Sequence, residues 1–83
     1  MSLNEELQEF IKENLASEDQ AVDITEETSL IARGIIDSMG LMQLMLFIEE
    51  RTRIRIPDEE ILPANFASIA SIVQTVERAR ARV

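Results

Sequence analysis

The sequence contains no cysteine and no histidine, and it also lacks tryptophan and tyrosine. These absences exclude a thiolate zinc site, a cysteine nucleophile and a serine–histidine catalytic pair. With 83 residues and no disulfide or zinc–thiolate site to reinforce a small core, the chain has to gain its stability from apolar packing. Its hydrophobic content of 46% suits closely packed aliphatic helices.

Basic residues are scarce as well, because 8 lysines and arginines stand against 16 aspartates and glutamates. The net charge of −8 argues against binding to nucleic acid or to an anionic membrane surface, both of which need a basic protein surface. It favours basic protein partners that approach by electrostatic steering. The charge is uneven, since residues 1–50 hold 12 acidic and 2 basic residues whereas residues 51–83 hold 4 and 6.

Long apolar runs are missing too. No stretch of about 18 consecutive apolar residues exists, so we expect no membrane-spanning segment. The N-terminal residues Met-Ser-Leu-Asn-Glu-Glu are acidic where a signal peptide would be basic. We therefore expect a cytoplasmic protein that forms a single domain over residues 1–83.

Helical periodicity occurs in three stretches. Ser2 and Glu5 form a capping-box pattern, and the apolar residues that follow predict a helix ending at about residue 15 or 16. A second helix is predicted to begin at Asp37 or Ser38 and to end at about Thr52. Ser68 is expected to cap a last helix. The residues predicted to face the core from the first and last helices are Leu3, Leu7, Phe10, Ile11, Leu15, Ile69, Ile72, Val73, Val76 and Ala79.

Between residues 17 and 37 the periodicity fails, which predicts a long first loop. Loops of this length inside small domains are usually functional or wrongly assigned. We interpret this one as an ordered crossover whose isolated apolar residues enter the bundle, namely Val22, Ile24, Leu30 and Ile31. A short helical turn over residues 30–33, closed by Gly34, is expected within it.

The second and last helices are joined by a segment with mixed signals. Residues 53–56 alternate in polarity, but Pro57 and the lack of a second strand favour an extended connector. Asp58 is expected to cap a short helical turn over residues 59–62, which Pro63 ends. The sequence thus predicts an all-α bundle of three main helices plus one short helix, with a long first loop.

The second helix has more apolar residues than one buried face needs, since seven of the eight residues from Leu41 to Ile48 are apolar. If Leu41, Leu44, Met45, Ile48 and Thr52 face the core, then Met39, Met42, Gln43, Leu46 and Glu50 lie on the opposite side. Exposed apolar stripes on small domains usually mark partner surfaces, and methionine adapts to varied partners. The alternatives are the centre of a fully buried helix or a dimer seam.

The dipeptide Asp37-Ser38 begins this second helix. Capping alone explains an Asp or Ser at such a place. Asp37 can cap by itself, however, which leaves the Ser38 hydroxyl free at the first helical position. A phosphodiester formed there would be favoured by the helix dipole and the free N–H groups. Gly40 removes one side chain near this attachment point, at a cost in helix propensity.

Ser38 lacks what a catalytic nucleophile needs. The chain has no histidine and one lysine, Lys12, which lies on a different predicted helix. No acidic residues are spaced for a metal that would activate water. We therefore predict no catalytic residues, no metal site and no enzyme activity. A serine that another enzyme modifies needs no base of its own.

The run Gly34-Ile-Ile-Asp37-Ser38-Met39 resembles the Gly-x-Asp-Ser-Leu core of the acyl carrier protein family, with Met39 in place of leucine. The resemblance covers roughly residues 28–76 and includes Glu49-Glu50 and the segment from Ile54 to Glu59. It implies an acyl-carrier-like bundle and a 4′-phosphopantetheine arm on Ser38, supported by Asp37. A phosphopantetheinyl transferase would install the arm from coenzyme A with Mg²⁺, and its thiol would hold acyl or aminoacyl groups as thioesters.

The resemblance also implies partners and a surface that docks them. The candidate partner-binding residues are Met39, Met42, Gln43, Leu46, Glu49 and Glu50. Fatty-acid carriers tend to have acidic residues where this chain has Gly40 and Gln43, and the sequence is more similar to stand-alone D-alanyl carrier proteins. This similarity implies loading by an adenylate-forming acyl or aminoacyl ligase or an acyltransferase, and use by downstream enzymes of a specialised biosynthetic pathway.

We expect the carrier to be a monomer. An alternative reading of the same residues is an unmodified helical interaction module that docks through Met39, Met42 and Leu46.

Overall fold

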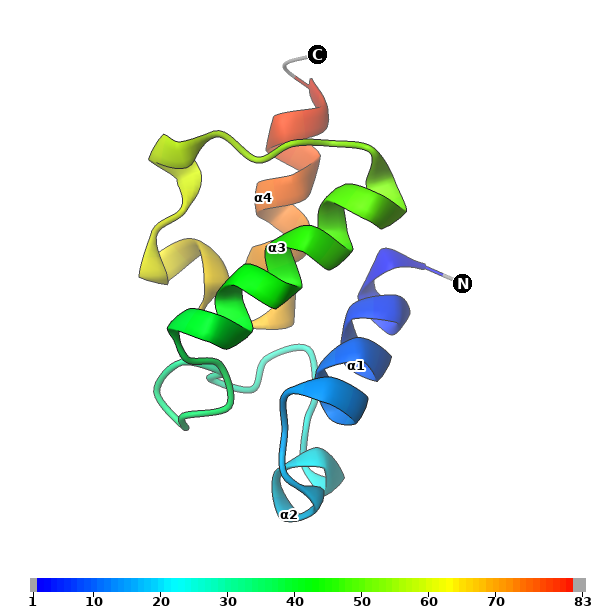
Figure 1. Cartoon of the computed structure of the whole chain (residues 1–83), viewed down its shortest axis with the longest axis vertical. Coiled ribbons are helices and arrows are strands. Elements are labelled where there is room, and N and C mark those ends of the chain that lie inside the picture. The colour runs from blue at the N-terminus through cyan, green and yellow to red at the C-terminus, as the bar shows by residue number, and fades with distance from the viewer. Residues whose placement is uncertain (1, 82–83) are drawn as a thin grey trace.

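The computed structural model describes residues 2–81, and within that range the chain is helical with no β-strand. The elements in chain order are α1 (Leu3–Asn14), α2 (Glu18–Val22), α3 (Ser38–Thr52), η1 (Asp58–Glu60), η2 (Pro63–Phe66) and α4 (Ile69–Ala81). Figure 1 shows α3 crossing in front of α4, with α1 beside them and α2 at one end of the molecule. The predicted bundle of three main helices is confirmed. None of the helices between residues 2 and 81 is both long and apolar enough to cross a membrane.

The three main helices begin where their polar caps predict. Ser2 Oγ accepts a hydrogen bond from Glu5 N (3.2 Å), and Ser68 Oγ accepts one from Ser71 N (3.2 Å). Helix α1 ends at Asn14, one residue before the expected end. Helix α3 ends at Thr52, as predicted, and Arg53 caps it in the left-handed conformation with φ 61°.

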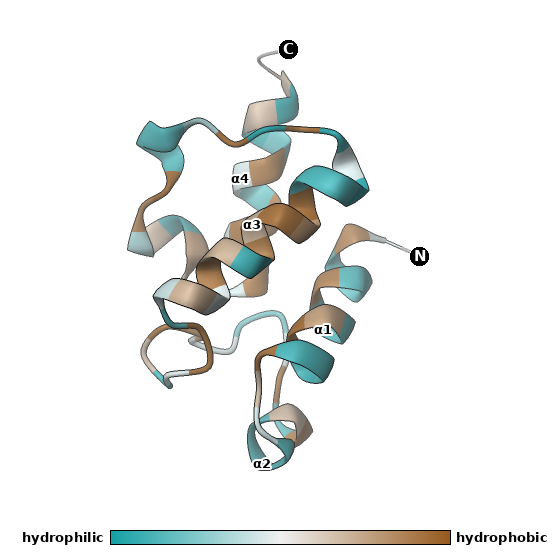
Figure 2. Cartoon of the chain, in the orientation of Figure 1, coloured by the Kyte–Doolittle hydropathy of each residue, from teal (hydrophilic) through white to brown (hydrophobic). Residues whose placement is uncertain are grey.

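One apolar core joins the three main helices to the segments between them. Its fully buried members include Leu7, Ile11, Leu30, Leu44, Ile48, Ile56, Phe66, Ile69, Ile72 and Val76. Helix α1 packs against α2 and α4, and α4 packs against η2. Figure 2 shows that α1 alternates between polar and apolar residues, whereas α3 is apolar along most of its length. This difference makes α3 the helix with apolar residues to spare.

The first loop holds a helix that the sequence did not predict. It contains α2, which Ser17 and Gln20 start with a complete capping box. The turn before α3 is closed as expected, since Gly34 has φ +73° and its N–H donates to Ile31 O (3.0 Å). The expectation that all four isolated apolar residues enter the bundle is half wrong. Ile24 and Leu30 are buried, but Val22 is 81% exposed and Ile31 is 38% exposed.

The connector after α3 is extended, as predicted, and two short 3-10 turns follow it instead of one. Asp58 does not act as the cap that was expected. It lies inside η1, Pro57 occupies the cap position, and no side-chain hydrogen bond starts the turn. The second turn, η2, begins at Pro63 because the fixed φ of proline suits a first helical position. It carries Phe66 into the core.

Candidate functional site

The start of α3 is held by Asp37. Its backbone is extended (φ −109°, ψ −170°), and its Oδ1 accepts a hydrogen bond from Gly40 N at 2.7 Å. Its carbonyl oxygen accepts the first intrahelical bond, from Leu41 N at 2.8 Å. One residue therefore supplies both groups that begin the helix. The structure bears out the prediction that Asp37 caps alone.

Ser38 is consequently left free at the first helical position. Its side chain is exposed, and its hydroxyl makes no hydrogen bond within residues 2–81. Four of the other five serines differ, because their hydroxyls bond within helix starts: Ser2, Ser17, Ser68 and Ser71. Ser29 has a free, exposed hydroxyl as well, but it precedes no helix. Among the serines of the described range, Ser38 is the one that combines an unbonded hydroxyl with a helix N-terminus, where an added phosphate is favoured.

Gly40 serves packing rather than access to Ser38, which corrects the interpretation drawn from the sequence. The residue is buried, and a Cβ atom there would lie 3.2 Å from Asp37 Oδ1 and 3.4 Å from Leu15 Cδ2. The contact with Asp37 is tighter than usual for a Cβ atom, and the contact with Leu15 is at the limit of ordinary van der Waals contact. Glycine at this position lets the end of α1 approach the first turn of α3 and leaves room for the capping carboxylate.

An open hollow of about 240 Å³ lies beside the candidate serine. Its lining residues are Ile31, Ile36, Asp37, Ser38 and Leu41. Ile31 also lines a second, mostly apolar hollow of about 340 Å³ that reaches Pro63 and Ala67. One signal in the sequence points to this, because Leu30 and Ile31 are adjacent and adjacent residues of a helical turn face different ways. The exposed Ile31 was missed as a neighbour of Ser38.

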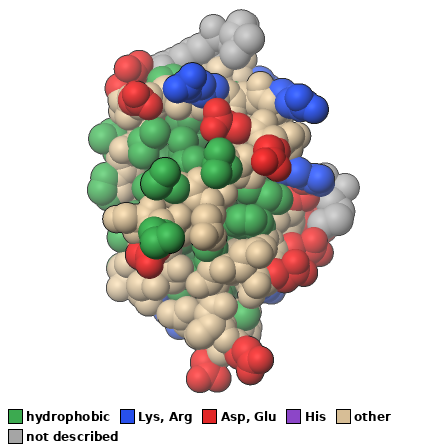
Figure 3. Space-filling model, viewed as in Figure 1, with side chains coloured by type: hydrophobic (Ala, Val, Ile, Leu, Met, Phe, Trp, Pro, Cys, Tyr) green, Lys and Arg blue, Asp and Glu red, His purple; other side chains and the backbone are tan. Residues whose placement is uncertain are grey.

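The predicted partner-binding residues lie along the outer side of α3. Met39, Met42 and Leu46 are 72%, 69% and 58% exposed, and we call these three residues the α3 stripe. Figure 3 shows hydrophobic side chains gathered over α3 on this face of the molecule. Gln43 and Glu50 are exposed on the same helix, whereas Glu49 is half-buried. The fully buried helix that was considered as an alternative is therefore wrong.

An ion pair between α1 and α3 was not predicted. Arg51 donates to the carboxylate of Glu6, which is itself largely covered, with a side-chain exposure of 18%. This hydrogen bond, together with the carboxylate's charge, raises the pKa of Arg51 above its ordinary value. The two residues are 45 positions apart, so no local sequence pattern could have revealed the contact.

Comparison with known proteins identifies the family. Residues 5–76 match the family described as "Phosphopantetheine attachment site". The chain belongs to this family. Its members bear 4′-phosphopantetheine as a covalently attached prosthetic group, and the geometry at the start of α3 fits that group because it offers a free hydroxyl at a helix N-terminus.

Three curated relatives are carrier or biosynthetic proteins. The chain is 34% identical over 58 residues to "Probable acyl carrier protein PigG" of Serratia sp. (strain ATCC 39006), covering 70% of this chain and 67% of that protein. It is 40% identical over 58 residues to "Aminoacyl carrier protein 1" of Bradyrhizobium diazoefficiens, covering 70% and 59%. It is 38% identical over 64 residues to "Lincomycin biosynthesis protein LmbN" of Streptomyces lincolnensis, covering 77% of this chain but only 23% of that protein.

Two solved structures have the same fold. Both are crystal structures of Bradyrhizobium japonicum glycine:[carrier protein] ligase, one complexed with glycylated carrier protein and one with its cognate carrier protein and an analogue of glycyl adenylate. The matched chains are 29% and 28% identical to this one, with TM-scores of 0.70 and 0.71. The alignments cover 90% and 93% of this chain, and 100% and 99% of the matched chains.

Proposed function

We propose that Ser38 carries the phosphopantetheine arm and that the chain is a non-catalytic carrier of acyl or aminoacyl groups. The observation that supports this most strongly is the hydroxyl of Ser38, which is exposed, unbonded and placed at the first position of α3. In the modification reaction, the serine oxygen bonds to the phosphorus that bears pantetheine, the pyrophosphate bond of coenzyme A breaks, and adenosine 3′,5′-bisphosphate leaves. The serine proton passes to a base of the transferase, and Mg²⁺ assists there.

The surroundings of Ser38 support a carrier rather than a catalyst. Activation of a serine requires an adjacent base, and the chain has no histidine. Its one lysine, Lys12, is on α1. No cluster of metal-ligating side chains occurs within residues 2–81 either. The transferase and the partner enzymes would supply all the chemistry.

The cargo we propose is an amino acid or another small acid, loaded by an adenylate-forming ligase for a specialised biosynthetic pathway. Three observations support this. The sequence around Ser38 is similar to stand-alone D-alanyl carriers. A relative is called an aminoacyl carrier protein, and both structural neighbours come from complexes of a glycine:[carrier protein] ligase.

The α3 stripe is the surface we propose for docking these enzymes. It lies on the same helix as Ser38, begins at the next residue and carries no charge of its own. An enzyme that reaches the hydroxyl would therefore cover the stripe. Gln43 and Glu50 flank it and would lie at the polar edge of such an interface, and the half-buried Glu49 would contribute less.

The proposal is tested by incubating the apo chain with coenzyme A, Mg²⁺ and a broad-specificity phosphopantetheinyl transferase, and then measuring the intact mass. We expect a single phosphopantetheine on the native chain. Ser38→Ala should stay unmodified, whereas Ser29→Ala, which removes the other free serine hydroxyl, should be modified fully. Modification of Ser38→Ala would contradict the assignment. No modification of the native chain would favour the unmodified interaction module.

A further inference from the structure

A second surface is formed between α1 and α3. Two adjoining hollows of about 360 and 280 Å³ share three lining residues, Phe10, Asn14 and Phe47. Together they make one groove along the two helices. We call it the α1/α3 groove. Ser38 does not line either hollow.

The floor of the groove is aromatic. The rings of Phe10 and Phe47 stack with centroids 4.3 Å apart and an interplanar angle of 22°. Both side chains are only half-buried, although most other large apolar residues of α1 and α3 that face inward are fully covered. Such a floor offers contact to aliphatic groups and attracts cations that lie over a ring face.

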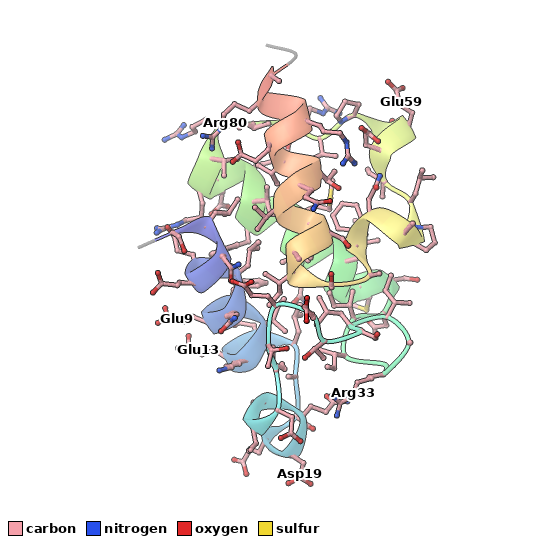
Figure 4. All side chains as sticks on the ribbon, turned by 180° about the vertical axis from the view of Figure 1, so that it is seen from behind. Glu9, Glu13, Asp19, Arg33, Glu59 and Arg80 are labelled. Carbon is pink, nitrogen blue, oxygen red and sulfur yellow. The ribbon has the colours of Figure 1, made fainter. Side chains whose placement is uncertain are left out.

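The rims of the groove are acidic. Glu9 and Glu13 line it from α1, and Glu50 lines it from α3. None of the three carboxylates forms a hydrogen bond or an ion pair within residues 2–81. Figure 4 shows Glu9 and Glu13 projecting from the outer edge of α1. Among the described residues, 2–81, the cation that lines the groove is Arg51, which is already paired with Glu6.

The groove is continuous with the α3 stripe. Leu46 belongs to the stripe and also lines the second hollow of the groove. A partner that covers the stripe can therefore extend around α3 into the groove without leaving apolar surface. The stripe is uncharged and the groove is negative. The stripe therefore suits apolar side chains of a partner, whereas the groove also suits basic ones.

We propose that the α1/α3 groove binds a cationic amphipathic helix of a partner protein. Its apolar side chains would lie on Phe10 and Phe47, and its lysine or arginine side chains would pair with Glu9, Glu13 and Glu50. We base this inference on charge complementarity, because three carboxylates without partners line the rims of an apolar floor and would attract basic side chains. The groove would add an electrostatic contact, sensitive to salt, to the docking surface beside Ser38.

The test uses the Ser38→Ala chain, so that its outcome does not depend on the modification. The probe is a synthetic 18-residue amphipathic helix, with leucines on one face and lysines on the other, added during amide chemical-shift mapping. Two peptides serve as controls: one has glutamate in place of every lysine, and the other has the same composition in scrambled order. We expect saturable shifts at residues 9–14 and 43–51 with the lysine peptide only.

A matched pair of variants then separates the groove from the overall charge. Glu9→Gln with Glu13→Gln removes two charges from the rim. Glu18→Gln with Asp19→Asn removes two charges from α2 (Figure 1), none of whose residues lines either hollow of the groove. We expect the rim variant to weaken peptide binding by about three- to ten-fold and the α2 variant to change it by less than about two-fold.

Three results would overturn the proposal. One is equal weakening by both variants, which would mean attraction to the net charge alone. Another is a set of shifts confined to the α3 stripe and the start of α3. The third is no saturable binding of the lysine peptide to the native sequence or to Ser38→Ala.

Discussion

The two sides of α3 are both rich in apolar residues, yet they differ in what covers them. Leu44 and Ile48 on the inner side are fully buried in the core. Met39, Met42 and Leu46 on the outer side remain more than half exposed. Burial of the inner side stabilises the bundle, whereas exposure of the outer side costs solubility without contributing to the core. The comparison shows that one helix holds the fold together and also presents a surface beside Ser38.

Substituting alanine for leucine at two positions, one on each side of α3, should affect stability very differently. Leu44→Ala should lower the free energy of unfolding by about 2–5 kcal/mol, because it leaves a cavity in a small core. Leu46→Ala removes a side chain that is 58% exposed, so it should change the free energy of unfolding by less than about 0.5 kcal/mol. Urea denaturation followed by circular dichroism measures both. Similar losses in the two variants would show that α3 does not have one buried and one free side.

The next prediction concerns the outer side alone. Met42→Glu places a charge on the α3 stripe and should raise the KM for the apo chain in the transferase reaction by about ten-fold, or roughly 1.4 kcal/mol, at unchanged stability. Val22→Glu is the matched control, because Val22 is 81% exposed on α2 and away from the stripe. Equal effects of the two substitutions on KM would remove the stripe from the docking surface.

A smaller effect is expected at the boundary between the two sides, where Asp37 begins α3. Asp37→Ala removes the acceptor of Gly40 N and should cost about 1 kcal/mol of stability. Asp37→Asn keeps an acceptor oxygen and should cost less than half as much. Thermal unfolding, together with hydrogen exchange of the amides of residues 38–41, tests this. An equal loss in both variants would mean that the charge, rather than the cap geometry, holds the helix start.

The smallest effect is expected at Gly40, and its sign should depend on Asp37. Gly40→Ala gains up to about 1 kcal/mol in helix propensity, but its Cβ would press on Asp37 Oδ1 at 3.2 Å. We expect a net loss below about 1 kcal/mol in the native chain. In the Asp37→Ala background that contact is gone, so the same substitution should stabilise. A double-mutant cycle measures the difference, and strict additivity would contradict the packing role of Gly40.

Much of α3 could be predicted because its signals are local. The cap at Asp37, the end at Thr52 and the exposed stripe all follow from positions within one helix. Helix α2 was missed although Ser17 and Gln20 form a capping box, because five residues are too few to show helical periodicity.

The features that escaped prediction depend on contacts distant in sequence. The pairing of Arg51 with Glu6 depends on how α1 crosses α3, and so does the stacking of Phe10 on Phe47. The role of Gly40 was misread for the same reason, since the nearby Leu15 comes from the end of α1. Sequence patterns describe the elements, but the surfaces between elements follow only from their packing.

The location of the added group decides whether Ser38 carries the arm. Trypsin cleavage after Arg33 and Arg51 releases residues 34–51, a peptide in which Ser38 is the only hydroxyl-bearing side chain. After treatment with coenzyme A, Mg²⁺ and the transferase, we predict that this peptide alone gains the mass of one phosphopantetheine. A gain on any other peptide, such as the one that carries Ser17 and Ser29, would contradict the assignment of Ser38.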